Sequence, residues 1–274
     1  MEKIRYDVAG ALTAIAEDLG PLLAGLPATP LELCLVAQGL VVPPDLAIGF
    51  GIPEERHGEK SVRAASDIIR TLGHLADRPI DEPRSFPDRV VGTCRHFSVL
   101  TCALLRHRGV PARSRCGFAS YFVPDRYVDH WVVEYWHGTQ QRWARVDPEI
   151  LGFDFVSTPE DLAEGDFLSG GEAWALCRQG EVDPARFGVD GVAYAWGIAE
   201  VRGNAVRDLA ALNKVEMLPW DEWGRMESSY ANQTGADYDE LMDAIAATCT
   251  SNDEGAIRRL YASEDLTVPE SMVV

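Results

Sequence analysis

The stretch GTCRHFSVLTCALLRHRGVPARSRC, which spans Gly92–Cys116, decides the fold. Its middle predicts one α-helix, because Thr93 is a suitable N-cap, apolar residues follow at helical spacing, and Gly109 and Pro111 end the pattern. A cysteine, Cys94, stands at the first position of this helix. A helix start offers unpaired N–H groups and the positive end of the helix dipole, and both favour a thiolate. We therefore expect the pKa of Cys94 to lie below the ordinary value of about 8.5, which makes Cys94 a candidate nucleophile.

The pattern downstream of this helix changes from helical to strand-like. Three segments rich in aromatic and β-branched residues follow, namely ARSRCGFASYFV (112–123), HWVVEYW (130–136) and QRWARVDPEI (141–150). One helix followed by consecutive antiparallel strands is typical of an α+β fold. The sequence therefore predicts a helix that carries the cysteine and packs on an antiparallel sheet.

The last two of these strands predict a β-hairpin. Gly138 suits the first central position of a two-residue type II′ turn, and this register places His130 opposite Asp147. Direct cross-strand partners have Cβ atoms about 4.5–5.5 Å apart, so Asp147 can orient the imidazole and stabilise its charged form. If this face packs against the helix start, Cys94, His130 and Asp147 form a Cys–His–Asp arrangement.

Two pairs of polar residues near this arrangement have open interpretations. Arg95 and His96 either face the cleft or belong to a solvated first turn of the helix. Glu134 and Arg145 lie diagonally on the predicted hairpin face, where they would form a supporting ion pair that is worth little if exposed.

Three segments, GTCRHFSVLTCALLRHRGVPAR, DHWVVEYW and RWARVDPE, resemble the core of transglutaminase-like proteins over roughly residues 85–150. The resemblance implies a papain-like α+β fold with Cys94 as nucleophile, His130 as general base and Asp147 as orienting acid. The segments FLSGGEAWALCRQGEVDPARFG and RGNAVRDLAALNKVEMLPWD also resemble bacterial transglutaminase-like proteins of unassigned activity. Many members carry an oxyanion-stabilising Trp, Gln or Asn upstream of the cysteine, but RSFPDRVVGT contains none, so the second oxyanion donor is unassigned.

We expect residues 1–274 to form a single transglutaminase-like domain. It would comprise a mostly helical N-terminal part (1–84), the catalytic core (85–155) and a mostly helical C-terminal elaboration (156–274). Residues 1–19 read as an amphipathic helix, and residues 61–79 as another, since Pro79 follows its apolar periodicity. The strongest helical patterns of the C-terminal part are EAWALCRQGEVDPARFG, EVRGNAVRDLAALNKVE and YDELMDAIAATC.

Composition restricts the partners and the location. The net charge of −18, from 25 basic and 43 acidic residues, argues against nucleic acid and against anionic membrane surfaces, and it weakly favours neutral or cationic substrates. No apolar run approaches the length of about 20 residues that spans a bilayer. The first 19 residues lack the features of a signal peptide, so a cytoplasmic location is expected.

Neither a metal nor another cofactor is expected. The six cysteines are scattered without a CxxC motif, and disulfides are rare in cytoplasmic chains. Cys94 and His96 are two residues apart on a helix and point to different sides, so they cannot chelate one ion. Calcium dependence, known in some relatives, lacks a ligand loop of the expected type.

The leading hypothesis is a cysteine-dependent acyl-transfer enzyme that acts on the amide bond of a small molecule or peptide through a thioester. Water or an amine acceptor would complete the reaction. Two alternatives stay open: a peptidase or peptide-N-glycanase-like amidase, and a non-catalytic binding module that retains the fold. The oligomeric state is not predicted.

Overall fold

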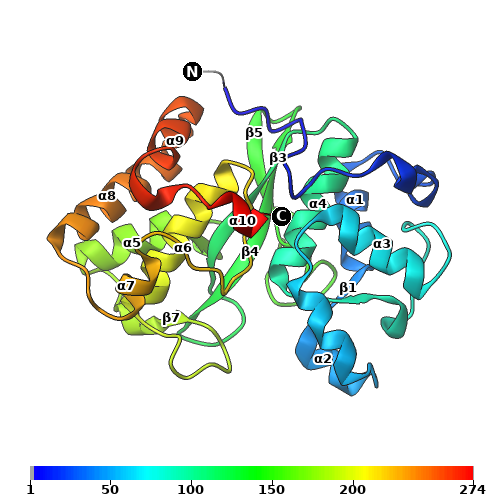
Figure 1. Ribbon diagram of the computed structural model, residues 1–274, viewed down its shortest axis with the longest axis horizontal. Helices are drawn as coiled ribbons and strands as arrows, with labels where there is room; N and C mark the ends of the chain where they lie inside the picture. The colour runs from blue at the N-terminus through cyan, green and yellow to red at the C-terminus, as the bar shows by residue number, and fades with distance from the viewer. Residues whose placement is uncertain (1–2, 274) are drawn as a thin grey trace.

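The computed structural model describes residues 3–273 and has an α+β architecture around one curled antiparallel sheet (Figure 1). The five-stranded sheet has the order β5-β4-β3-β6, and β7 pairs in parallel with β4. Its strands are β3 (Ala112–Ala119), β4 (Tyr127–His137), β5 (Arg142–Val146), β6 (Phe167–Ser169) and β7 (Phe187–Gly188). A separate parallel pair is formed by β1 (Val41–Val42) and β2 (Val90–Val91). The predicted fold class is confirmed.

Helices flank the sheet in two groups (Figure 1). The N-terminal group contains η1 (Glu17–Leu23), α1 (Pro30–Gln38), α2 (Pro44–Gly49), η2 (Glu54–Ser61), α3 (Ala65–Leu75), η3 (Phe86–Asp88) and α4 (Cys94–His107). The C-terminal group contains α5 (Gly170–Gln179), η4 (Pro184–Arg186), α6 (Ile198–Leu212), α7 (Met226–Tyr230), α8 (Ala236–Thr250), α9 (Glu254–Tyr261), η5 (Glu264–Leu266) and α10 (Glu270–Val273). The η elements are short 3₁₀-helices.

Helix α4 is the central helix, and it has the predicted limits. Thr93 is its N-cap, and Gly109 lies just beyond its end with a φ of 72°, a left-handed conformation that glycine adopts without strain. Every residue from 95 to 106 is buried, because helices α1 and α3 and the sheet pack around α4. A helix enclosed on all sides can present reactive groups only at its ends.

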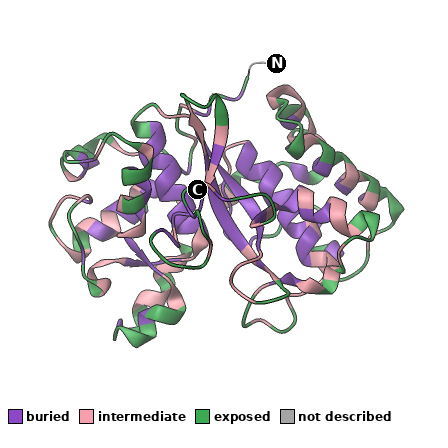
Figure 2. Cartoon of the chain, turned by 180° about the vertical axis from the view of Figure 1, so that it is seen from behind, coloured by how far each residue is buried: buried purple, intermediate pink, exposed green. Residues whose placement is uncertain are grey.

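Two apolar cores lie on either side of the sheet, and buried residues concentrate along the sheet and the helix faces next to it (Figure 2). One core joins α1, α3 and α4 to strand residues such as Val133, and the other joins α5, α6 and α8 to Phe118. Because the same strands contribute to both cores, the organisation agrees with a single domain over residues 1–274, which stays a prediction.

Helix α6 covers the free edge of β3. Strand β6 pairs only with the last three residues of β3, which leaves earlier backbone groups of that strand without a strand partner. Side chains of α6 take this role, since Asp208 accepts the Cys116 N–H at 3.0 Å and Asn204 donates to the Gly117 carbonyl at 3.1 Å. Covering an edge in this way satisfies its polar groups and blocks further strand addition.

The β4–β5 hairpin exists, but its predicted register is wrong. The observed pairs are Trp136 with Trp143 and Glu134 with Arg145, a shift of two residues from the expected register. The connection is a four-residue loop, residues 138–141, in which Gln141 rather than a glycine has the positive φ of 53°. Glu134 and Arg145 are therefore direct partners, and their expected diagonal placement is corrected.

The predicted helix at residues 1–19 is also wrong over the part that the structure describes. Residues 3–16 contain turns, and the first helical element is η1. Ile4 and Tyr6 pack into the C-terminal core, whereas Leu19 and Leu23 pack into the N-terminal core. The segment crosses from one core to the other, which its irregular path allows. Within residues 3–273 no helix has the length and apolarity needed to cross a membrane.

Candidate active site

Cys94 lies at the first position of α4, directly after the short strand β2. Cys94 is partly exposed and packs against a small apolar cluster of Cys116, Trp131 and Ala211. The approach to the helix is tight, because a Cβ on Gly92 would lie 2.7 Å from Cγ of His96. A side chain at position 92 would therefore displace the first turn that presents the thiol.

His130 and Asp147 are hydrogen-bonded, with 2.8 Å between Nε2 and Oδ2. The contact does not come from direct cross-strand pairing, since the last ladder pair joins Val133 to Val146. Asp147 instead follows the end of β5, where its backbone N–H donates to the Pro159 carbonyl at 2.9 Å. The predicted partnership therefore forms beyond the end of the β4–β5 ladder and not through the predicted register.

The Asp147 carboxylate accepts three hydrogen bonds. Oδ2 accepts from His130 and from the Tyr121 hydroxyl at 2.6 Å, and Oδ1 accepts from the Glu149 N–H at 2.9 Å. Three donors fix the orientation of a buried carboxylate and stabilise its charge. Because Nε2 of His130 faces Asp147, Nδ1 is the nitrogen left for the Cys94 thiol, which lies near enough to help raise the pKa of His130. The structure thus brings together all three residues that the sequence singled out, while their catalytic role stays a prediction.

Electrostatics favour a positively charged His130. Burial alone would lower its pKa, but the charge and hydrogen bond of Asp147 and the contact with Cys94 raise the pKa of His130 well above its usual value. Burial raises the pKa of the Cys94 thiol, and the hydrogen bond and charge of His130 oppose this effect. The expected low pKa of Cys94 is therefore not found, because burial outweighs the advantage of the helix start. The thiolate depends on His130 as its partner.

Arg95 and His96 do not face the cleft and are not solvated. Arg95 is fully buried and donates from Nε to the Glu216 carbonyl at 2.9 Å. Nδ1 of His96 accepts from the Thr93 N–H at 3.1 Å, and Nε2 donates to the Val62 carbonyl at 3.0 Å. Burial lowers the pKa of His96 to about 3, with a further contribution from the charge of Arg95, so the ring is neutral. Both residues anchor the helix start that carries Cys94.

Aromatic side chains pack against the buried His130 ring. The Phe122 ring meets the imidazole edge-to-face with centroids 4.9 Å apart, and Phe155 meets Phe122 at 5.4 Å. Phe153 follows at 6.4 Å from Phe155. We call Phe122, Phe153 and Phe155 the aromatic ledge. Sequence reasoning missed these residues and Tyr121, because they lie in loops whose positions depend on long-range contacts.

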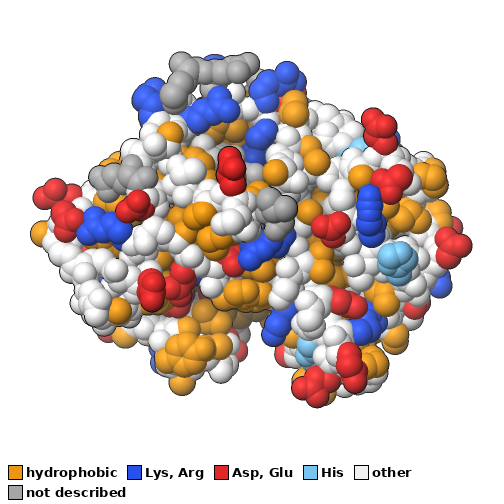
Figure 3. Space-filling view, viewed as in Figure 1, with side chains coloured by type: hydrophobic (Ala, Val, Ile, Leu, Met, Phe, Trp, Pro, Cys, Tyr) orange, Lys and Arg blue, Asp and Glu red, His pale blue; other side chains and the backbone are white. Residues whose placement is uncertain are grey.

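The lower side of the molecule, where β4 begins, is hollowed between the loop after β7 and helix α2 (Figure 3).

Within residues 3–273 no group of three or more His, Cys, Asp or Glu side chains lies close enough to hold a metal ion. All six cysteines are free thiols, and four of them are buried: Cys34, Cys102, Cys116 and Cys249. Cys94 and Cys177 are the two that are partly exposed.

Comparison with known proteins supports the predicted class. Residues 53–148 match the sequence model of the transglutaminase-like superfamily. The match supports the resemblance predicted from the sequence, and over these residues it favours a papain-like cysteine enzyme family in general. The matched segment begins at η2, well upstream of the expected start, and ends one residue after Asp147. No curated protein and no solved structure matches the chain.

Proposed function

We propose that this protein is a cysteine-dependent acyl-transfer enzyme that cleaves an amide bond through a thioester on Cys94. The observation that carries the proposal is the hydrogen bond between His130 and Asp147, together with the proximity of Cys94 to the same imidazole. The superfamily match supports a cysteine enzyme in general. In this proposal Cys94 is the nucleophile, His130 the base and Asp147 the orienting acid.

The reaction would proceed in two stages. In the reactive pair the proton of the Cys94 thiol is held on Nδ1 of the charged His130, and the thiolate sulfur attacks the carbonyl carbon of the amide. A C–S bond forms, and the electron pair of the C=O bond moves to the oxygen. As that pair returns, the C–N bond breaks and the leaving amine takes the proton from the His130 imidazolium. The product of this stage is a thioester on Cys94 and a free amine.

The second stage restores the enzyme. His130 accepts a proton from water or from an incoming amine, which attacks the thioester carbonyl. The C–S bond breaks, and the Cys94 thiolate is restored beside the His130 imidazolium. The backbone N–H of Cys94, one of the unpaired N–H groups of the first helical turn, is one candidate donor to the oxyanion of both stages. The second donor is still unassigned.

The test uses p-nitrophenyl acetate as an acyl donor and intact-mass spectrometry as the readout. We expect an acetyl adduct on Cys94 that is absent from Cys94→Ala and formed far more slowly in His130→Ala. Cys177→Ala is the matched control, because Cys177 is the other partly exposed thiol and lies outside the triad. Equal acetylation of Cys94 and Cys177, unaffected by His130→Ala, would favour the non-catalytic binding module.

The fate of the acetyl group separates hydrolysis from transfer. Adding a small primary amine to the acetylated enzyme should give an N-acetyl product if an amine acceptor can reach the thioester. Release of acetate alone would favour the peptidase or amidase alternative.

A further inference from the structure

Glu149 presents an unpaired carboxyl group beside the candidate triad. Its backbone is fixed on both sides, since its N–H donates to Asp147 Oδ1 at 2.9 Å and its carbonyl accepts from Gln38 Nε2 at 3.1 Å. Oε2 is buried without a hydrogen-bond partner, and among residues 3–273 no ion pair engages this carboxylate. The carboxyl group is close enough to His130 and Cys94 to influence the pKa of both. An unpaired acid on a fixed backbone beside the candidate triad is available to bind a group of a ligand.

This arrangement differs from that of two fully buried acids of the sheet region. Glu134 and Asp208 are each paired with arginine, and Asp129 accepts a hydrogen bond from Asn204. An unpaired buried carboxylate is costly, which is why such groups are either paired or protonated. Burial raises the pKa of Glu149 to about 7, with the charges of Asp147 and Asp45 adding to the effect and that of His130 opposing it. A cation placed next to Glu149 would relieve this cost by supplying the missing partner.

The aromatic ledge supplies a second feature that suits a cation. Phe153 and Phe155 are 57% and 49% exposed, and Phe155 contacts Phe122, which covers His130. Aromatic faces attract ammonium and guanidinium groups through their quadrupole. Asp147 accepts the Glu149 N–H and also binds Nε2 of His130, and Phe122 of the ledge meets the His130 ring, so Glu149 and the ledge both border the histidine of the candidate triad.

We propose that the substrate of Cys94 carries a fixed positive charge, an ammonium or guanidinium group, which binds between the Glu149 carboxylate and the aromatic ledge. The inference rests on the proposed function and deepens it by naming a chemical class of substrate. The cation is a recognition group and not the attacking amine, because an amine must lose its proton before it can attack a carbonyl carbon.

The test needs no knowledge of the natural substrate, because Cys94 itself can report the local charge. Three methanethiosulfonates serve as probes: the cationic 2-aminoethyl, the neutral methyl and the anionic 2-sulfonatoethyl reagent. In each case the Cys94 thiolate attacks the reagent's divalent sulfur, a disulfide forms, the bond to the sulfonyl sulfur breaks, and methanesulfinate leaves with its electron pair. Rates for the cationic and anionic reagents are divided by the rate for the neutral reagent in the same variant, which cancels differences in thiolate fraction.

We expect Cys94 to prefer the cationic over the anionic reagent, and Glu149→Gln to reduce this preference on the order of tenfold at pH 8.5. Glu160→Gln makes the same chemical change at an exposed position and should leave the preference unaltered. Phe155→Leu should lower the rate of the cationic reagent more than that of the neutral one. A preference that is absent, or equal in the Glu149→Gln and Glu160→Gln variants, would overturn the proposal.

The pH dependence of this preference for cationic reagents provides a second test. The preference should grow as the pH rises through about 7, because the Glu149 carboxyl ionises there, and it should not do so in Glu149→Gln. The other groups that act on Glu149 or share its surroundings are Asp45 on α2, Cys94 on α4, His130 on β4, Tyr121 and Asp147. Loss of the His130 charge at higher pH would also favour cationic reagents, but that change persists in Glu149→Gln and is therefore separable.

Failure of the proposed function and failure of the cation proposal give different patterns of Cys94 reactivity. If Cys94 is not an activated nucleophile, it will react with the neutral reagent no faster than Cys177, and His130→Ala will not slow it. If only the present inference fails, Cys94 will react rapidly with the neutral reagent in a His130-dependent way and show no Glu149-dependent charge preference.

Discussion

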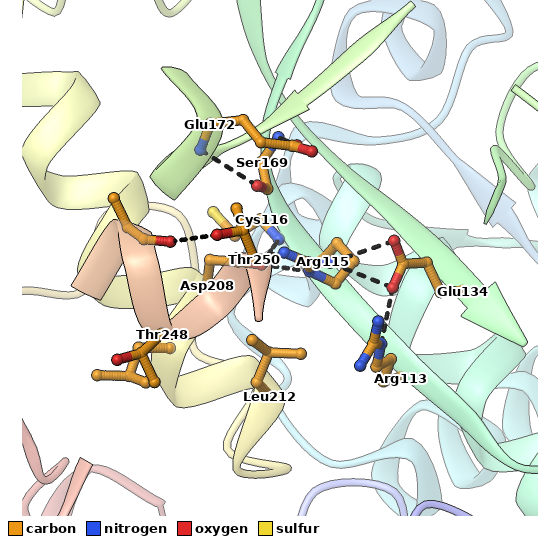
Figure 4. A network of polar contacts seen from close by, with 12 residues as sticks. Arg113, Arg115, Cys116, Glu134, Ser169, Glu172, Asp208, Leu212, Thr248 and Thr250 are labelled. Atoms are coloured by element: carbon orange, nitrogen blue, oxygen red, sulfur yellow. Dashed lines mark hydrogen bonds and ion pairs between the residues drawn. The ribbon is translucent and has the colours of Figure 1, made fainter. Parts of the chain in front are cut away.

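The two ends of strand β4 carry buried charges that are arranged in opposite ways. At one end Glu134 faces three arginines, with Arg113 at 2.7 Å, Arg115 at 3.2 Å and Arg145 at 2.8 Å. Arg115 also binds Asp208 on α6 at 2.8 Å, so that each charge in this cluster has a partner (Figure 4). At the other end, His130 and Asp147 form a pair and Glu149 is left without one.

The contrast between paired charges around Glu134 and the unpaired Glu149 shows that cavity size alone does not locate a reactive site. A cavity of about 480 Å³ lies at the arginine end, lined by Arg113, Arg142 and Trp143 among others. Its arginines are already engaged, since Arg142 binds Asp161 and Arg113 binds Glu134 and Asn252. Paired charges stabilise the packing of β3, β4 and α6, whereas an unpaired acid beside a thiol and an imidazole is free to meet a substrate.

The largest effect on stability should come from removing the central acid of the paired cluster. Glu134→Gln leaves two buried arginines, Arg113 and Arg115, and the partly exposed Arg145 with too few anions, and we expect the free energy of unfolding to fall by about 3–5 kcal/mol. Urea unfolding measures the change. Asp161→Asn is the control, because its partner Arg142 is largely exposed, and it should cost less than about 1 kcal/mol. Equal losses in both variants would mean that burial does not distinguish the two ion pairs.

Removing the His130 imidazole at the other end of β4 should lower the reactivity of Cys94. Burial raises the pKa of Cys94 and the contact with His130 opposes it, so His130→Gln should slow alkylation of Cys94 by iodoacetamide on the order of a hundredfold at pH 6.5. Peptide mapping provides the rate for each cysteine. Cys177, whose pKa burial raises to about 11, is the internal reference and should stay slow in both proteins. A Cys94 that reacts as slowly as Cys177 in the unaltered protein contradicts the prediction.

Tyr121 should have a smaller effect as a positioning residue, since its hydroxyl binds Asp147 and not Cys94. Tyr121→Phe removes one of three donors to Asp147, which concentrates negative charge on the carboxylate facing His130. We expect the acetylation rate to fall about fivefold and stability to fall by about 1 kcal/mol. The pKa of His130, followed by NMR, should rise. An unchanged His130 pKa with lower stability would indicate a structural role only.

Local sequence signals predicted the parts of this site that local physics determines. The limits of α4 follow from the Thr93 cap, helical periodicity and Gly109, all within one segment. The two-residue turn that predicts the pairing of His130 with Asp147 does not exist, and the contact forms beyond the last ladder pair. Gly138 lies in the four-residue loop, but Gln141 is the residue in the left-handed region, so the glycine indicates the wrong turn and the wrong register.

The remaining residues depend on contacts between distant segments. Tyr121 and Phe122 follow the end of β3, and their approach to His130 requires the fold of the whole β3–β4 connection. Glu149 is positioned by Gln38, which is 111 residues away in the chain. Arg95 and His96 looked like surface residues of a first turn, yet η2 and the C-terminal part enclose them. No periodicity or motif in the sequence encodes such placements.

A further effect concerns how pH acts on the unpaired acid at the His130 end. The folded-state pKa of Glu149 is raised from 4.5 to about 7, so folding favours its protonated form. This contribution to stability is fully present below about pH 4.5 and is lost as the pH rises through about 7. The glutamine in Glu149→Gln cannot ionise. As the pH rises from about 4.5 to about 7, the free energy of unfolding of this variant should therefore increase relative to that of the unaltered protein. Parallel stability curves for the two proteins in urea titrations at pH 5 and pH 8 would show that Glu149 has found a partner in solution, and that the two ends of β4 do not differ in this respect.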